Sequence, residues 1–249
     1  MNLSGKISLV TGGTRGIGAA TAKLLAREGS DVAIAARRID DEARATQAAI
    51  TKLGRRCHLI RADFGKPEDA GRCVTETETN LGPVDVLVHS AGGPVNGGLF
   101  DLTPEKWMEA FDVHVHAIFH LCRAALPAMR KKKEGSVILI SSTAGIRGVV
   151  TNVAYQTAKG ALPQFARALA REFANDNIRI NCVAPGVVRT DFHAAMTEEQ
   201  KRLNLEHRIP LHREGTPADV AELIVTLVKN DYITGETMVI DGGLTMRIA

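Results

Sequence analysis

Short apolar runs alternate with longer amphipathic stretches along the whole chain. The short runs are rich in Val, Ile, Leu and Ala, and several are nearly continuous rather than alternating with polar residues. Continuous apolar runs are typical of parallel strands that are covered on both faces. The predicted strands are Lys6–Thr11, Asp31–Ala36, Cys57–Ala62, Val84–His89, Ser136–Ser141, Ile178–Ala184 and Thr237–Ile240.

Between these runs, apolar positions recur at helical spacing. In the stretch Ile17–Glu28, the side chains of Ile17, Ala20 and Leu24 fall on one helix face, and Gly29 follows at a position where helices commonly end. The other predicted helices are Asp40–Leu53, Pro67–Leu81, Thr103–Arg130, Asn152–Asn175 and Pro217–Val228.

The alternation of strands and helices predicts an α/β fold. We expect a doubly wound, Rossmann-type parallel sheet of about seven strands with helices on both faces. No linker or shift in composition divides residues 1–249, so we predict a single domain. The polar stretch 189–215 leaves the sixth strand at the sheet edge where ligands bind in this fold. We interpret it as a substrate lid rather than a bare loop.

Composition narrows the function classes. Hydrophobic residues make up 45% of the chain, enough for a large core, and the net charge of +3 is too small to indicate a nucleic-acid partner. No apolar run is long enough to span a membrane. The four cysteines lie far apart without metal-ligand spacing, which is typical of reduced thiols in a cytoplasmic protein.

A glycine-rich turn follows the first strand and opens the first helix. Glycines permit a tight turn and a close approach of backbone to a ligand, and a helix N-terminus offers unpaired N–H groups to phosphate. A purely structural turn is the alternative, but the place of this turn in an alternating chain favours dinucleotide binding. The candidate residues here are Gly12, Thr14, Arg15, Gly16, Ile17 and Gly18.

Tyr155 and Lys159 are spaced four residues apart, so both side chains lie on one face of a predicted helix. A free tyrosine has a pKa near ~10 and is a poor acid–base catalyst at neutral pH. We expect the neighbouring ammonium to favour the phenolate and to lower the pKa of Tyr155. The spacing alone is common by chance, but Ser142 at the end of the fifth strand adds a third polar group.

Taken together, these motifs resemble the classical short-chain dehydrogenases/reductases over essentially the full length. Further matches are Ala62-Asp63-Phe64, Ser90-Ala91-Gly92 in place of the usual Asn-Ala-Gly, Pro185-Gly186-Val187-Val188-Arg189-Thr190, Ile233-Thr234-Gly235 and Asp241-Gly242-Gly243. The resemblance implies a nicotinamide cofactor that contacts Asp63, Phe64, Ser90, Ala91, Gly92, Tyr155, Lys159, Pro185, Gly186, Val188 and Thr190.

The resemblance also divides the catalytic work. Tyr155 would exchange a proton with the substrate oxygen, Lys159 would hold the nicotinamide ribose and lower the Tyr155 pKa, and Ser142 would hydrogen-bond the substrate oxygen. The hydride would come from the cofactor.

The end of the second strand indicates NADP(H) rather than NAD(H). NAD enzymes place a carboxylate there to bind the ribose hydroxyls, whereas a 2′-phosphate needs cations. Here Ala36 occupies that position and Arg37 follows it. In this fold Arg15 would lie beside them, so Arg15 and Arg37 are candidates to bind the phosphate. Arg38 is interpreted as part of a solvated helix start.

Three positions depart from the family pattern. His114 stands where the family has a catalytic Asn, which supports a water relay through its main-chain carbonyl; we list His114 with the catalytic candidates. An imidazole there would titrate near pH ~6.5 if unperturbed. His89 precedes Ser90 in place of asparagines that brace the sheet. Pro163 lies inside the catalytic helix and should bend it.

A metal site is the alternative for the histidines His114, His116 and His120, but no acidic partner or third ligand accompanies them in the sequence. We therefore predict no metal. The family resemblance implies a homotetramer through the helices Thr103–Arg130 and Asn152–Asn175, with His116, Cys122 and Phe165 as candidates for burial there.

The predicted function is the interconversion of a carbonyl and an alcohol on a small-molecule substrate, with a ketone or 3-oxoacyl group reduced to a hydroxyl. A polyol or sugar dehydrogenase and a non-catalytic NADP-sensing protein are the alternatives. Reductases of acyl-carrier substrates use a basic pair beside the active site. Lys133 matches one cation, but Asp176 stands where the second belongs.

Overall fold

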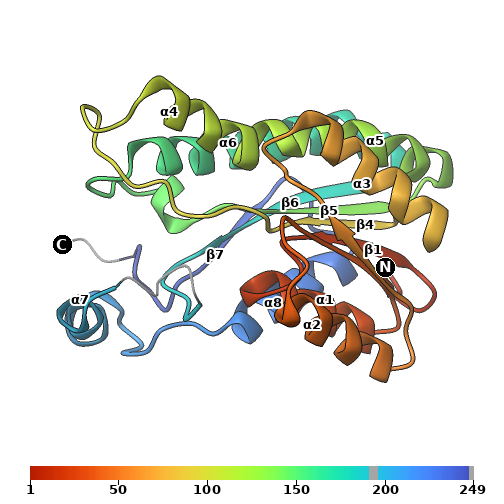
Figure 1. Cartoon of the computed structure of the whole chain (residues 1–249), viewed down its shortest axis with the longest axis horizontal. Coiled ribbons are helices and arrows are strands. Elements are labelled where there is room, and N and C mark those ends of the chain that lie inside the picture. The colour runs from red at the N-terminus through yellow and green to blue at the C-terminus, as the bar shows by residue number, and fades with distance from the viewer. Residues whose placement is uncertain (191–195, 247–249) are drawn as a thin grey trace.

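All seven predicted strands form one parallel sheet in the computed structural model, which describes residues 1–190 and 196–246 (Figure 1). The strand order is β3-β2-β1-β4-β5-β6-β7. The strands are β1 (Ile7–Thr11), β2 (Asp31–Ala36), β3 (Cys57–Arg61), β4 (Val86–His89), β5 (Gly135–Ile140), β6 (Ile178–Pro185) and β7 (Thr237–Ile240). The predicted doubly wound sheet is confirmed.

Helices cover both faces of the sheet, as Figure 1 shows. One layer contains α3 (Pro67–Asn80), α4 (Pro104–Phe111), α5 (Ala117–Lys132) and α6 (Val153–Glu172). The other contains α1 (Gly16–Arg27), α2 (Asp41–Lys52) and α8 (Pro217–Lys229). A buried hydrophobic cluster lies between the sheet and each layer. This two-sided burial explains why the strand sequences are apolar without alternation.

The strand order reverses between β1 and β4, which pair directly although two strands separate them in the chain. Connections leave the neighbouring strands in opposite directions at such a point, so a crevice forms beyond their carboxyl ends. The glycine turn after β1 and the Ser90-Ala91-Gly92 segment after β4 therefore meet at that crevice.

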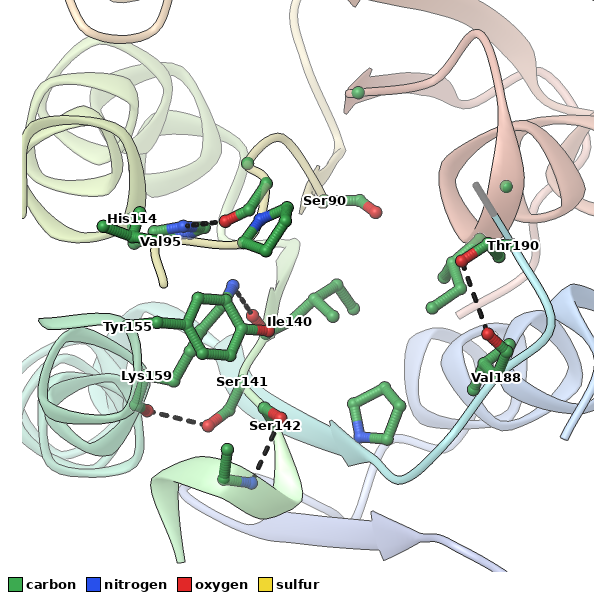
Figure 2. Close-up of a pocket in the computed structure, with 18 of the residues that line it drawn as sticks. Ser90, Val95, His114, Ile140, Ser141, Ser142, Tyr155, Lys159, Val188 and Thr190 are labelled. Carbon is green, nitrogen blue, oxygen red and sulfur yellow. Dashed lines mark hydrogen bonds between the residues drawn. The ribbon is translucent and has the colours of Figure 1, made fainter. Parts of the chain in front are cut away.

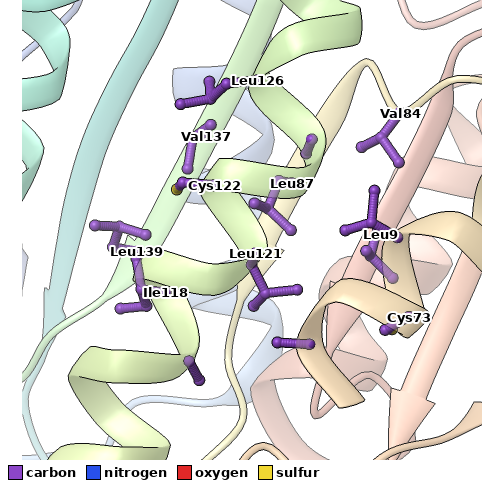
Figure 3. Close-up of a cluster of buried hydrophobic side chains, with 14 of the residues drawn as sticks. Leu9, Cys73, Val84, Leu87, Ile118, Leu121, Cys122, Leu126, Val137 and Leu139 are labelled. Carbon is purple, nitrogen blue, oxygen red and sulfur yellow. The ribbon is translucent and has the colours of Figure 1, made fainter. Parts of the chain in front are cut away.

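The predicted helix Thr103–Arg130 contains a change of helix type. A π-helical segment, Asp112–His116, separates α4 from α5. π-Helical segments are rare in proteins, and they often occur at functional sites. Within α5, Cys122 is buried against the sheet near Val137 (Figure 3). The proposed burial of Cys122 in a subunit interface is therefore wrong, because its side chain faces the core.

The segment predicted as a lid, 189–215, includes residues 191–195, which lie outside the described residues. Its described part contains the helix α7 (Glu198–Leu203) and a π-helical turn, Asn204–Arg208. A capping box between Thr197 and Gln200 begins α7. Figure 1 shows α7 set apart from the two helical layers, beyond the carboxyl ends of the strands.

Helix α6 continues through Pro163, which has no N–H to donate to the carbonyl of Lys159. The Ser141 hydroxyl supplies the missing hydrogen bond, at 2.7 Å from Oγ to the Lys159 oxygen. Both groups are buried, so this side chain satisfies a carbonyl that would otherwise lack a partner. Gly145 makes the approach possible, because a Cβ there would lie 2.7 Å from the Lys159 carbonyl carbon.

We expect Ser141→Ala to lower the free energy of unfolding by about 1–3 kcal/mol, the cost of an unsatisfied buried carbonyl. Adding Pro163→Ala to that variant should recover much of the loss, because an alanine at this position restores the helical N–H donor. Urea denaturation of the two single variants and the double variant measures the coupling. Additive effects in this cycle would contradict the assigned partnership.

Candidate active site

A cavity of about 1390 Å³ opens at the carboxyl ends of the strands. Every residue that the sequence singled out for cofactor binding or catalysis lines it, from the glycine turn at one end to Ser142 and Tyr155 at the other. The fold therefore brings these residues together, while the role of each stays a prediction.

The glycine turn forms a cradle without room for side chains. A Cβ at Gly12 would lie 2.8 Å from the Ala91 backbone nitrogen, and a Cβ at Gly18 would lie 2.1 Å from the Gly12 oxygen. Gly12 and Gly16 also adopt positive φ angles of 64° and 52°. The turn leads directly into the N-terminus of α1, where unpaired N–H groups favour an anion. This geometry fits a dinucleotide pyrophosphate.

Three arginines line the far end of the cavity: Arg15, Arg37 and Arg38. Arg15 contacts two carboxylates, those of Asp40 and of Glu42, the latter at 3.0 Å. These ion pairs are solvent-exposed, and such pairs contribute only about 0–1 kcal/mol. A phosphate dianion that binds at this end can therefore displace or share them. The carboxylate expected of an NAD enzyme is absent, because Ala36 ends β2.

Two elements position the catalytic candidates (Figure 2). Tyr155 and Lys159 lie one turn apart on α6 and are both buried. Ser141 and Ser142 follow β5 with side chains on opposite sides, as expected from strand geometry. Ser141 therefore faces α6, while the Ser142 hydroxyl reaches the cavity and hydrogen-bonds Tyr155.

Burial shifts both catalytic pKa values. Loss of solvent raises the pKa of Tyr155 to about 12, although its hydrogen bond with Ser142 acts in the opposite direction. The predicted lowering by Lys159 is wrong for this structure, because burial outweighs any neighbouring charge. Burial also lowers the pKa of Lys159 to about 8. Its ammonium donates a hydrogen bond to the Ile140 carbonyl at 2.7 Å and lies 5.7 Å from the centre of the Tyr155 ring.

His114 lies in the π-helical segment and packs edge-on against Tyr155, with ring centres 5.3 Å apart. Its Nε2 lies 3.1 Å from the Gly93 carbonyl and must donate, since a carbonyl only accepts. Burial, followed by the charge of Lys159, lowers the His114 pKa to about 2. The expectation that His114 titrates in the working range is therefore wrong. Gly92 permits this packing, because a Cβ there would lie 2.1 Å from the imidazole Cε1.

His89, in place of an asparagine, joins the sheet to the π-helical segment. Its Nε2 donates to the Val113 carbonyl at 3.1 Å, and its Nδ1 accepts from the Thr11 hydroxyl at 2.8 Å. Thr11 Oγ1 in turn accepts from the Ala91 N–H at 3.2 Å. Burial lowers the pKa of His89 to about 3, so the ring stays neutral and each nitrogen has one fixed role.

Among the described residues, no group of three His, Cys, Asp or Glu side chains converges to hold a metal ion. The sequence analysis found no acidic partner for the helical histidines, but the structure places Asp112 Oδ1 2.8 Å from His116 Nδ1. Two side chains do not make a metal site, so His116 is better described as hydrogen-bonded to Asp112 at the surface. No helix in the described part of the chain is long and apolar enough to cross a membrane.

Several lining residues were missed by the sequence analysis. They line the cavity from segments distant in the chain: Val95, Glu109, Arg147, Asn152, Asn204, His207, Arg208 and Thr245. No spacing links them, because only the fold brings these loops together.

Comparisons with known proteins agree with this geometry. A family model described as Enoyl-(Acyl carrier protein) reductase matches residues 12–245. Carbonyl reductase family member 4 from Xenopus laevis is 37% identical over 244 residues, which cover 98% of this chain and 99% of that protein. A 3-oxoacyl-[acyl-carrier-protein] reductase from Bos taurus is 37% identical over 243 residues, covering 98% and 99%.

A solved structure has the same fold. The L-sorbose reductase from Gluconobacter frateurii, complexed with NADPH and L-sorbose, superposes with a TM-score of 0.91 at 28% identity. The likeness covers 100% of both chains.

The two buried histidines predict a loss of stability in acid. Because the folded-state pKa values of His89 and His114 lie far below the ordinary 6.5, the unfolded chain binds protons that the folded chain does not. The contribution of these two neutral histidines to the free energy of unfolding is therefore complete above about pH 6.5 and is lost progressively as the pH falls below that value. Lowering the pH from about 7.5 to about 5.5 should reduce the free energy of unfolding of both proteins. The reduction should be smaller by about 1.4 kcal/mol in His114→Asn than in the unmodified chain.

Urea denaturation at the two pH values measures this difference. His120→Asn, at a half-buried position on α5, is the matched control and should follow the unmodified chain. Parallel acid profiles for His114→Asn and the unmodified chain would show that His114 is protonated in the folded state.

Proposed function

The chain belongs to the classical short-chain dehydrogenase/reductase family and is an NADP(H)-dependent oxidoreductase of carbonyl and alcohol groups, and we propose that it reduces a ketone or 3-oxoacyl group with Tyr155 as proton donor. The observation that carries this proposal is the placement of Tyr155, Ser142 and Lys159 on the same cavity as the glycine cradle. A hydride donor bound along that cradle would share one space with the proton donor.

In the proposed reaction, one set of residues binds the cofactor and another set transfers the proton. The nicotinamide ring supplies the hydride when the cofactor is bound. The glycine turn and the N-terminus of α1 would hold the pyrophosphate, and Arg37 with Arg15 would hold the 2′-phosphate. Asp63, Phe64 and the Ser90–Gly92 segment line the cavity between these points and would contact the nucleoside.

Tyr155 would donate a proton to the oxygen of the reduced carbonyl. With a pKa of about 12 the phenol carries its proton at neutral pH, but it is a weaker acid than a free tyrosine. Ser142 would hydrogen-bond the same oxygen and hold it near the phenol. Negative charge develops on that oxygen during reduction, and the buried ammonium of Lys159 would stabilise it, since charges interact more strongly in a buried site.

A free substrate fits the structure better than one bound to an acyl carrier protein. Carrier proteins are acidic, and their reductases use a basic pair beside the active site. Here Lys133 forms an ion pair with Asp176, and Arg130 Nε lies 2.9 Å from the same carboxylate. Asp176 therefore offsets one of the two positive charges of Arg130 and Lys133, on which an acidic partner would bind. Its carboxyl has a lowered pKa, chiefly through the hydrogen bond from Lys133.

Two alternatives remain testable on the same protein. A polyol or sugar dehydrogenase would use the same residues, and the likeness to an L-sorbose reductase favours a hydroxylated substrate. A non-catalytic NADP sensor is disfavoured, because a sensor has no need of the buried Tyr155 and Lys159. Turnover assays with ketoses, small ketones and 3-oxoacyl thioesters separate these possibilities.

For the whole chain we propose one domain, cytoplasmic localisation and a homotetramer. The segment 189–215 would act as a lid, which the position of α7 beyond the strand ends supports (Figure 1). The assembly would use α4, α5 and α6, where Phe119 is an exposed apolar side chain and Phe165 is partly buried.

Tyr155→Phe should lower kcat by at least about 10²-fold, because it removes the proton donor, whose contribution is typically ~10²–10⁴-fold. NADPH affinity should change little, since only one oxygen is lost. Lys159→Ala should damage both kcat and NADPH affinity. Initial rates and fluorescence titration with NADPH measure the two effects. A Tyr155→Phe enzyme that keeps more than about a tenth of kcat refutes the assigned role.

The cofactor preference should depend on Arg37. Arg37→Ser should raise KM for NADPH by about tenfold, the loss of one charge-assisted interaction, and Ala36→Asp with Arg37→Ser should move the preference toward NADH. Arg38→Ser is the matched control and should have a small effect. Steady-state kinetics with both cofactors provides the test, and equal kcat/KM for NADPH and NADH in the unmodified enzyme is the result that excludes phosphate recognition.

The proposed assembly predicts a molar mass of a multiple of the 26.7 kDa chain. Light scattering at micromolar concentration should give a tetramer, and Phe119→Asp should weaken it by placing a charge in the interface. A monomer in the unmodified protein would rule out the proposed contact.

A further inference from the structure

We propose that the substrate of this enzyme carries an anionic group, a carboxylate or a phosphate, that is recognised by Arg147 and Arg208. The inference rests on the proposed carbonyl reduction and specifies its substrate class. Both arginines line the cavity that contains Ser142 and Tyr155, and both are solvent-exposed, so they lie where that cavity opens.

Each guanidinium is held by neutral partners. Arg147 Nη2 donates to the Thr245 carbonyl at 2.6 Å, and Arg208 Nη1 donates to the Asn204 side-chain oxygen at 3.0 Å. Asn204 is itself buried, so it is a fixed support for Arg208. These contacts orient the two cations and leave their charge uncompensated.

Some arginines of the described chain form ion pairs with carboxylates, and others, such as Arg44 and Arg202, do not. Arg72 forms an ion pair with Asp69, and Arg213 forms one with Asp219. Neither Arg147 nor Arg208 takes part in an ion pair among the described residues. The residues at this opening that carry charge are Glu109, Arg147 and Arg208, with His207 beside them, so positive charge exceeds negative.

The segments that carry Arg147 and Arg208 both contact the stretch 242–245. Arg147 contacts the C-terminal segment at Thr245, and the segment after Arg208 packs on that same stretch, with the Leu211 N–H donating to the Gly242 carbonyl at 3.2 Å. A planar, always charged guanidinium binds carboxylate and phosphate groups with two parallel hydrogen bonds. An anion of the substrate would thus fix its orientation while the carbonyl lies near Tyr155.

Kinetics with matched ketones tests the proposal. The probes are acetoacetate, its methyl ester and acetoacetyl-CoA, with NADPH oxidation as the readout. The unmodified enzyme should prefer the anionic probes. In Arg147→Gln and in Arg208→Gln, the ratio of kcat/KM for the anion to that for the ester should fall about tenfold or more, as expected for hydrogen bonds to a charged group. Arg202→Gln, an exposed arginine of α7 outside the cavity, is the matched control and should keep that ratio.

The pattern of losses identifies the anion. A fall for acetoacetate alone indicates a carboxylate, and a fall for acetoacetyl-CoA alone indicates phosphate; either supports the proposal. Equal losses for the ester and the anions, or no loss, would overturn it.

A binding measurement separates this inference from the proposed reaction. Calorimetric titration of acetoacetate into Tyr155→Phe loaded with NADPH should show binding that weakens about tenfold when Arg147→Gln is added. Such binding without turnover by the unmodified enzyme would retain the anion site and refute the reaction. Turnover with binding unaffected by Arg147→Gln would retain the reaction and refute the site.

Discussion

The hydrogen bond from Ser141 to the Lys159 carbonyl fixes helix α6 against the end of β5, and the active site depends on this contact. Pro163 leaves that carbonyl without its helical donor, and Gly145 leaves space for the approach. Once α6 is held there, Lys159 and Tyr155 reach the carboxyl ends of the central strands. Their burial follows from the same packing and sets both pKa values.

A second set of buried hydrogen bonds, centred on His89, holds the part of the cavity wall that faces the Tyr155 ring. His89 connects β1 and β4 to the carbonyl of Val113, within the π-helical segment. His114 of that segment then packs on Gly92 and against the Tyr155 ring. Both imidazoles are neutral because burial disfavours their charged forms. In this chain, therefore, two histidines act as fixed hydrogen-bonding groups and not as proton carriers.

Sequence reasoning reached the sheet, its helices and the residues around the cofactor, because apolar runs and glycine spacing are local signals. It missed the electrostatic environment. Whether Lys159 or burial controls the Tyr155 pKa depends on how much solvent the fold removes, and no local pattern records that. For the same reason His114 was expected to titrate. Arg147 and Arg208 were missed because they belong to separate connections that meet only at the cavity opening.

The central claim is hydride transfer between NADP(H) and a carbonyl in this cavity, and isotope transfer tests it most directly. NADPH that carries deuterium at the transferable position of its nicotinamide ring should deliver that deuterium to the carbinol carbon of the product. Mass spectrometry of the alcohol should therefore show one deuterium for each NADPH oxidised. Product without deuterium from either face of the labelled ring, or no product from any ketone, would contradict the account.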